Sequence, residues 1–164
     1  MKRRNFIKFT TISAILFSTN ISIAKNIPNK TLLVLDEVLN IIFPKTSTMP
    51  SAKEFKALEY LVKNISHKTF DNEDKTLILD GTNDFIGSFP EFLTLNNNEK
   101  KELIFEIIKN SAYAKSWVSK ITYYGIEGML SDPIYGGNFN QIAWSSVNHA
   151  VGIPRPLKTY GQKI

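Results

Sequence analysis

The chain of 164 residues contains 20 basic and 15 acidic residues but no cysteine. Without thiols it cannot form thiolate zinc sites, iron–sulfur clusters, covalent c-type haem or disulfide bonds, so we expect its fold to be stabilised by packing alone. An apolar content of 43% is ordinary for a globular protein and argues against disorder.

The first 24 residues have the layout of a twin-arginine export signal, which directs folded cargo to a dedicated translocon. The motif combines two arginines with a following aromatic residue and a lysine: Arg3, Arg4, Phe6 and Lys8. An uncharged segment follows, residues 9–24, in which hydroxyl side chains dilute the apolar ones. Ser22 and Ala24 place small residues where a signal peptidase cuts, so we predict cleavage after Ala24.

Two other interpretations of this segment stay open. It could be a retained membrane anchor, although it is shorter and more polar than the roughly 20 apolar residues that a span requires. It could also be a general secretory signal in which the two arginines occur by chance. The order of Phe6 and Lys8 after the arginine pair, and the low hydrophobicity of residues 9–24, favour the twin-arginine signal.

Removal of residues 1–24 would change the charge of the chain. This segment holds four of the 20 basic residues and no acidic one, so the remainder carries 16 basic and 15 acidic residues, a net charge of +1. The basic character of the whole chain therefore belongs largely to the signal. Nothing indicates a nucleic-acid partner, which would require a basic patch in the folded part.

From residue 25 onward the sequence predicts one small all-helical domain, residues 25–164, with a long loop-rich tail. Apolar spacings of three and four predict a helix with Thr31 as its N-cap and Pro44 at its end. A second amphipathic helix is expected from about Ala52 to Lys68. No segment shows the alternation that is typical of strands.

Residues 71–95 are harder to assign. Leu77-Ile78-Leu79 fits either a short buried strand or a helix that Gly81, Gly87 and Pro90 interrupt. The length of the segment and the spacing of its aromatic residues favour the helix.

The next two helices are expected on either side of a break near Asn110. Residues 96–99 predict a loop that feeds the N-cap of the first of them. The second is expected to stop at Gly125 or Gly128, since glycine is common just after the end of a helix.

The residue types that carry most enzyme chemistry are scarce. His67 and His149 are the only histidines, and neither has a second metal ligand at helical spacing. No serine lies in a Gly-x-Ser-x-Gly elbow, and Gly136-Gly137 does not extend to a dinucleotide- or phosphate-binding loop. The sequence therefore predicts no catalytic, cofactor-binding or metal-ligating residues in this chain.

The tail from Ser131 onward is rich in turn-forming residues. Asp132 fits a turn before Pro133, and the glycine pair that follows permits positive φ or the close approach of another backbone. Two interpretations remain open: a tight turn that only shapes the fold, or a docking loop for a partner. A short helix around residues 142–147 and an extended end at residues 152–156 are expected after it.

The string Asp132-Pro133-Ile134-Tyr135-Gly136-Gly137-Asn138 is the most specific motif of the chain. Glu127-Gly128-Met129 precedes it, and Trp144 and Gly152-Ile153-Pro154 follow it. In this order the elements resemble the C-terminal signature of the gluconate 2-dehydrogenase subunit 3 family, and the resemblance covers most of residues 31–156. Ala143-Trp144-Ser145 stands where the family often has Gly-Trp-Lys, and Pro154-Arg155-Pro156 extends its usual ending. Both departures leave the partner and the substrate open.

The resemblance implies the small, non-catalytic subunit of a periplasmic flavin dehydrogenase that oxidises sugars or sugar acids and is membrane-associated through its complex. The chain would supply the export signal and stability to a large FAD-containing subunit, often with a multihaem cytochrome c as a further partner. The implied contact residues are those of the signature: Asp132, Pro133, Tyr135, Gly136, Gly137, Asn138 and Trp144. The alternatives are a self-standing periplasmic enzyme or ligand-binding domain with a pocket at residues 132–138, and a signal-anchored structural protein.

Overall fold

A computed structural model describes residues 27–153 of the chain. Within this range the chain forms six α-helices joined by loops and short 3₁₀ turns, with no strand, which confirms the expected all-helical class. The predictions for residues 1–24 and for the chain beyond Ile153 lie outside the described residues. None of the helices between residues 27 and 153 is both long and apolar enough to cross a membrane.

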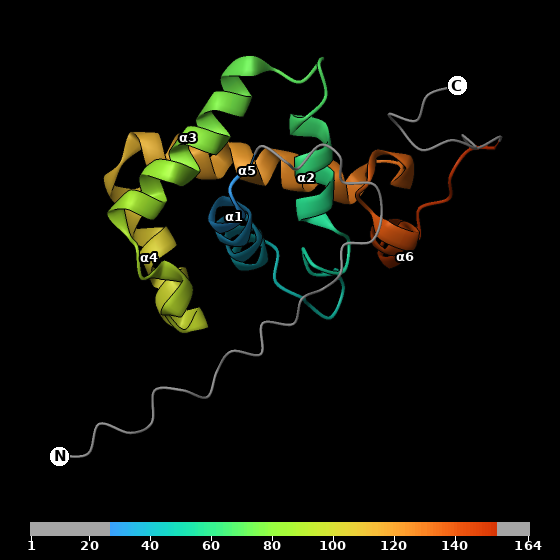
Figure 1. Cartoon of the computed structure of the whole chain (residues 1–164). Helices are drawn as coiled ribbons and strands as arrows, with labels where there is room; N and C mark the ends of the chain where they lie inside the picture. The colour runs from blue at the N-terminus through green and yellow to red at the C-terminus, as the bar shows by residue number, and fades with distance from the viewer. Residues whose placement is uncertain (1–26, 154–164) are drawn as a thin grey trace, which may run out of the picture.

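The helices pack around α1, which Figure 1 shows nearly end-on in the centre of the domain. Helix α1 contacts α2 and α5 as well as α3 and α4. The longest helix, α5, runs behind the others and contacts all of them. In chain order the helices are α1 (Asn29–Ile42), α2 (Ala57–Ile65), α3 (Asn72–Ser88), α4 (Asn97–Asn110), α5 (Ala112–Leu130) and α6 (Ile142–Ser146).

The core combines aliphatic side chains from α1 through α5 with an aromatic group formed by Phe85, Phe92 and Trp117. Phe85 stacks on Trp117 with ring centroids 5.1 Å apart, and Phe92 meets the edge of Phe85 at 4.8 Å. The buried indole Nε1–H of Trp117 donates to the hydroxyl of Thr82 at 3.2 Å, so the ring is buried without an unpaired donor. Burial of this kind supplies most of the stability of a domain without disulfides.

Two predicted helix starts were wrong. Helix α1 begins at Asn29 rather than after Thr31, and the buried Thr31 hydroxyl donates to Oδ1 of Asn83 on α3 at 3.0 Å. Helix α2 begins at Ala57 rather than near Ala52, because Lys56 has a left-handed backbone (φ 61°) that interrupts any continuous helix.

The glycines predicted to stop or interrupt helices lie inside them. Helix α3 passes through Gly81 and Gly87 to Ser88, and α5 passes through Gly125 and Gly128 to Leu130. Residues 77–79, which fitted either a helix or a strand, lie within α3.

These helical glycines allow aromatic rings to lie directly on helix backbones. A Cβ atom at Gly125 would lie 2.2 Å from Cε2 of Phe43, and one at Gly81 would lie 2.6 Å from Cδ1 of Trp117. Real Cβ atoms do not approach other atoms so closely. The glycines therefore bring α5 close to its neighbours rather than ending it.

The predicted N-cap at the start of α4 is confirmed, but residues 96–99, which were expected to form a loop, are the cap at Asn96 and the first turn of the helix. The Asn96 side chain accepts hydrogen bonds from the backbone N–H groups of Asn98 and Glu99, and the Glu99 carboxylate accepts one from the N–H of Asn96. This capping box satisfies donors that the first turn of a helix leaves unpaired.

Gly125→Ala tests the close contact between α1 and α5. We expect it to lower the free energy of unfolding by about 1–3 kcal/mol, because the added methyl group overpacks the site against Phe43. Gly87→Ala is the matched control, because a Cβ there would contact nothing within 4 Å. We expect it to raise the free energy of unfolding by up to about 1 kcal/mol, since alanine has a higher helix propensity than glycine. Thermal and urea unfolding measure both, and equal effects would contradict the overpacking argument.

Candidate functional site: the loop after helix α5

The signature loop, which we define as residues 131–141, turns back against α2 and α5. Its first turn is a 3₁₀ segment, Pro133–Tyr135, that Asp132 caps by accepting a hydrogen bond from the N–H of Ile134 at 3.0 Å. Gly136 ends this turn with a left-handed backbone (φ 103°), which favours glycine.

At Gly137 the loop backbone touches the backbone of α5. A Cβ atom at this position would lie 2.2 Å from the carbonyl oxygen of Gly128, so no residue with a side chain fits without a shift of the main chain. The other side of Gly128 packs against Tyr60 of α2, where an added Cβ would lie 2.8 Å from Cδ1 of the ring. Gly128 thus joins α2, α5 and the loop in one contact.

Asn138 holds the two ends of the loop together. It is fully buried and left-handed (φ 43°). Its Nδ2 donates to the carbonyl of Ser131 at 3.1 Å, and its Oδ1 accepts from the N–H of Ala143 at the start of α6 at 2.9 Å. Trp144 adds a bond from its Nε1 to the carbonyl of Leu130 at 2.8 Å, which satisfies an acceptor at the end of α5.

Helix α2 supports the loop from the other side. The Lys63 ammonium donates to the carbonyl of Ile134 at 3.0 Å, and the Asn64 amide donates to the carbonyl of Tyr135 at 3.4 Å. Partial burial against the loop lowers the pKa of Lys63.

The seven residues predicted as partner contacts therefore lie together, and most of them contact their own chain. Asp132, Gly137, Asn138 and Trp144 each fix the loop to itself or to α5. This geometry favours the interpretation of the motif as a turn that shapes the fold. A contact with a partner at these residues stays a prediction.

An exposed apolar surface on α5 was missed by sequence reasoning. Tyr123, Ile126 and Leu130 are 59%, 42% and 50% exposed, and their spacing of three and four places them on one side of the helix. We call these three residues the α5 apolar face. The signal was present in the sequence, but a helix that is apolar on two sides gives no indication of which side the core uses.

The hydroxyl of the buried Tyr60 lies within electrostatic range of both the α5 apolar face and the loop. Burial raises the pKa of Tyr60 well above its usual range, and the Glu127 carboxylate, to which the hydroxyl donates, raises it further. Tyr123 of the α5 apolar face and Tyr135 of the loop both lie close enough to add to this shift.

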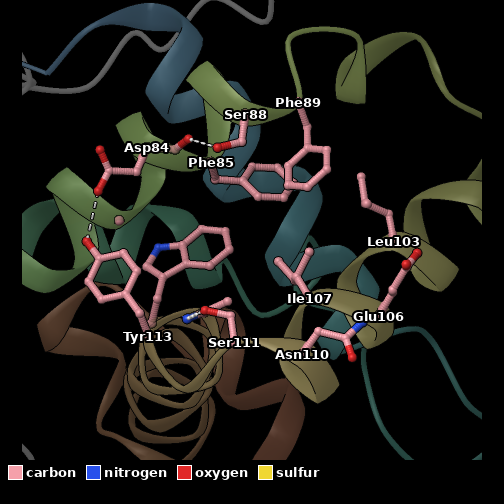
Figure 2. A pocket seen from close by; sticks show the side chains of 13 residues that line it. Asp84, Phe85, Ser88, Phe89, Leu103, Glu106, Ile107, Asn110, Ser111 and Tyr113 are labelled. Carbon is pink, nitrogen blue, oxygen red and sulfur yellow. Dashed lines mark hydrogen bonds between the residues drawn. The ribbon is translucent and has the colours of Figure 1, made fainter.

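One recess lies beside Tyr60 and Glu127, and another lies at the opposite end of α5. The first, about 290 Å³, is lined by Tyr60, Asn64, His67, Thr69, Phe70, Asp71, Tyr124 and Glu127. Its Tyr124 hydroxyl donates to Asp74 at 2.6 Å, and burial together with that carboxylate raises the pKa of Tyr124. The second, about 400 Å³, lies between α3, α4 and the start of α5 (Figure 2). Residues 132–138, where the alternative hypothesis places a pocket, line neither recess.

The two histidines take local roles. His67 Nδ1 lies 2.7 Å from the Thr69 hydroxyl, and the His149 ring packs against Trp144 with centroids 5.4 Å apart. Across residues 27–153, no three side chains of the metal-ligating types come together.

The family model of gluconate 2-dehydrogenase subunit 3 matches residues 29–152. The chain belongs to this family. The matched range contains all six helices and the signature loop. No curated protein and no solved structure matches the chain. Membership of the gluconate 2-dehydrogenase subunit 3 family makes this chain a subunit of a dehydrogenase complex and implies a catalytic partner.

Asn138→Ala tests how the family signature is held. We expect it to lower the free energy of unfolding by about 2–4 kcal/mol, because it leaves a buried carbonyl and a buried N–H unpaired. Asn140→Ala is the matched control, because Asn140 is also left-handed (φ 53°) but exposed. Its substitution should lower the free energy of unfolding only by the cost of placing alanine in a left-handed conformation. Thermal unfolding of both variants measures the difference, and equal losses would contradict a bonding role for Asn138.

Proposed function

We propose that this chain is the non-catalytic small subunit of a flavin-dependent dehydrogenase of the gluconate- or sugar-oxidising type. It provides the twin-arginine signal, Arg3 and Arg4 with Phe6 and Lys8, for export of the catalytic flavoprotein and stabilises that subunit. FAD belongs to the large subunit, and a multihaem cytochrome c is a further partner. The complex works in the periplasm and is membrane-associated through its other subunits.

The α5 apolar face is the observation that carries this proposal. Three large apolar side chains on the outer side of one helix are costly to leave in water, and exposed apolar patches mark protein–protein contacts. The same side of α5 is polar nearer its start, with Lys115, Ser116 and Ser119. The apolar character is therefore local to the end of α5 that adjoins the signature loop. Obligate interfaces bury on the order of 2,000 Å² or more and have apolar, aromatic-rich centres.

The fixed loop supports the same conclusion. Asn138 and Gly137 hold the backbone of the signature before any partner binds, so little conformational entropy remains to be lost on association. Tyr135, 37% exposed, presents an aromatic ring from this rigid loop. Tyrosine is a residue type that concentrates at the energetic centres of interfaces.

The export role follows from the sequence before Ile27. A twin-arginine signal suits a complex whose cofactor is inserted before export, and the composition of this chain points to a cofactor held elsewhere. One signal on the small subunit would then serve the whole complex.

Paired substitution of the α5 apolar face tests the interface. We expect Ile126→Gln with Leu130→Gln to weaken the complex at least about tenfold, because buried apolar anchors carry much of the binding energy. The measurement is the amount of flavin, read by absorbance, that co-purifies with the tagged full chain from its own cells.

The matched control is Leu33→Gln with Phe105→Gln, which removes exposed apolar side chains from α1 and α4. Both pairs are exposed, so each substitution should change stability by no more than about 0.5 kcal/mol. Equal flavin recovery with the two pairs would place the interface elsewhere. A chain that never co-purifies with a flavoprotein would overturn the proposed function.

Arg3→Lys with Arg4→Lys tests the export role. We expect both this chain and the flavoprotein to remain in the cytoplasm, because the translocon reads the arginine pair rather than its charge. Lys2→Arg is the control, since it changes a neighbouring basic residue and leaves the pair in place. Fractionation with antibodies against both subunits gives the result, and normal export of the flavoprotein in the absence of this chain would contradict the escort role.

A further inference from the structure

The cleft between α3, α4 and α5 lies away from the α5 apolar face and is used by neither the loop nor the proposed interface. Its walls are apolar and half-buried: Phe89, Leu103 and Ile107 line it above a floor of Phe85 and Trp117. At about 400 Å³ it falls in the range of roughly 300–1,000 Å³ that is usual for binding sites.

The rim of the cleft is acidic. Asp84 and Glu106 line it, and Figure 2 shows them toward opposite ends of the recess. The Tyr113 hydroxyl donates to the Asp84 carboxylate at 3.1 Å. Loss of hydration, this carboxylate and the nearby Asp80 all raise the pKa of Tyr113. Among the described residues that line the cleft there is no lysine or arginine. An apolar recess between carboxylates fits a segment that combines apolar and basic side chains.

The chain contains such a segment before the described residues. Positions 1–9, Met-Lys-Arg-Arg-Asn-Phe-Ile-Lys-Phe, place three apolar side chains after two arginines, with four basic residues and no acidic one. The next acidic residue of the chain is Asp36, inside α1.

We propose that, before export, Phe6–Phe9 occupies the cleft of its own domain, with the neighbouring basic residues against Asp84 and Glu106. The segment is thereby withheld from the translocon until it is released. This inference goes beyond the proposed function and rests on it only in taking residues 1–24 to be present until export.

The connection between the two parts permits this contact. The 18 residues from Phe9 to Ile27 can extend to about 60 Å, whereas a domain of this size has a radius of gyration of about 14 Å. The described chain also enters the domain against α3, where Thr31 bonds to Asn83, the residue before Asp84. A tethered segment meets its site at an effective concentration on the order of millimolar, so a modest affinity is sufficient.

The cleft is a better site for this segment than the α5 apolar face. The α5 apolar face is the convex outer side of one helix, whereas the cleft is a recess between three helices. Two carboxylates, those of Asp84 and Glu106, also line the cleft. A recess of this kind excludes water from the apolar side chains that enter it.

Cross-linking in the full chain tests the proposal, and the absence of native cysteine makes it unambiguous. Thr10→Cys with Ser88→Cys places one thiol just after the segment and one on the rim of the cleft. Thr10→Cys with Lys53→Cys is the control, because Lys53 is exposed and does not line the cleft. A short bifunctional thiol reagent should link the first pair about tenfold faster, as expected for a contact held by two ion pairs. Equal rates would overturn the proposal.

Charge substitutions separate this proposal from the export role. Asp84→Asn with Glu106→Gln should reduce linkage of the first pair to the control rate and leave the export of the complex intact. Arg3→Lys with Arg4→Lys should block export and leave linkage unchanged, because the positive charge is kept. Linkage that survives loss of both carboxylates would refute the charge pairing, whereas a failure of export alone bears on the proposed function. Circular dichroism confirms that each variant is folded.

Discussion

The domain depends on direct contact between the backbone of α5 and its neighbours at Gly125 and Gly128. Phe43 lies on the first glycine, Tyr60 lies on the second, and Gly137 of the loop meets the carbonyl of the second from another direction. Residues 27–153 contain no cysteine and no cluster of three metal-ligating side chains, so these close contacts and the aliphatic core are the interactions that hold α1, α2 and the loop to α5. The candidate site exists only because a helix, a ring and a loop converge on Gly128.

The helical class and the elements with strong periodicity were predictable. The apolar spacings around Leu35 and Leu39, and the Asn96 to Glu99 cap, are local signals that need no knowledge of distant residues. The glycines of α5 were wrongly predicted to end the helix, because glycine is common just after helix ends. Glycine can also leave room for an aromatic ring against the helix backbone, but that depends on a residue far away in the sequence. Phe43 is 82 positions from Gly125.

The residues that make up the signature loop could be predicted from the sequence, but the contact that each of them makes could not. The signature string correctly indicated a turn, yet the buried bonds of Asn138 and the Trp144 bond to Leu130 depend on the whole loop being closed. The α5 apolar face could not be assigned from sequence, since Tyr123 and Tyr124 are adjacent and only packing decides that Tyr124 is buried. The residues of the signature string thus shape the fold, whereas the α5 apolar face lies on the helix that precedes them.

The contact between Gly137 and Gly128 has a consequence for how such a subunit can diverge. It joins main chain to main chain, so the position of the loop does not depend on which side chains the outer side of α5 carries. Substitutions at Tyr123, Ile126 and Leu130 can alter the shape and chemistry of the exposed surface while the loop stays in place. One scaffold can therefore acquire new binding partners over evolution without having to refold.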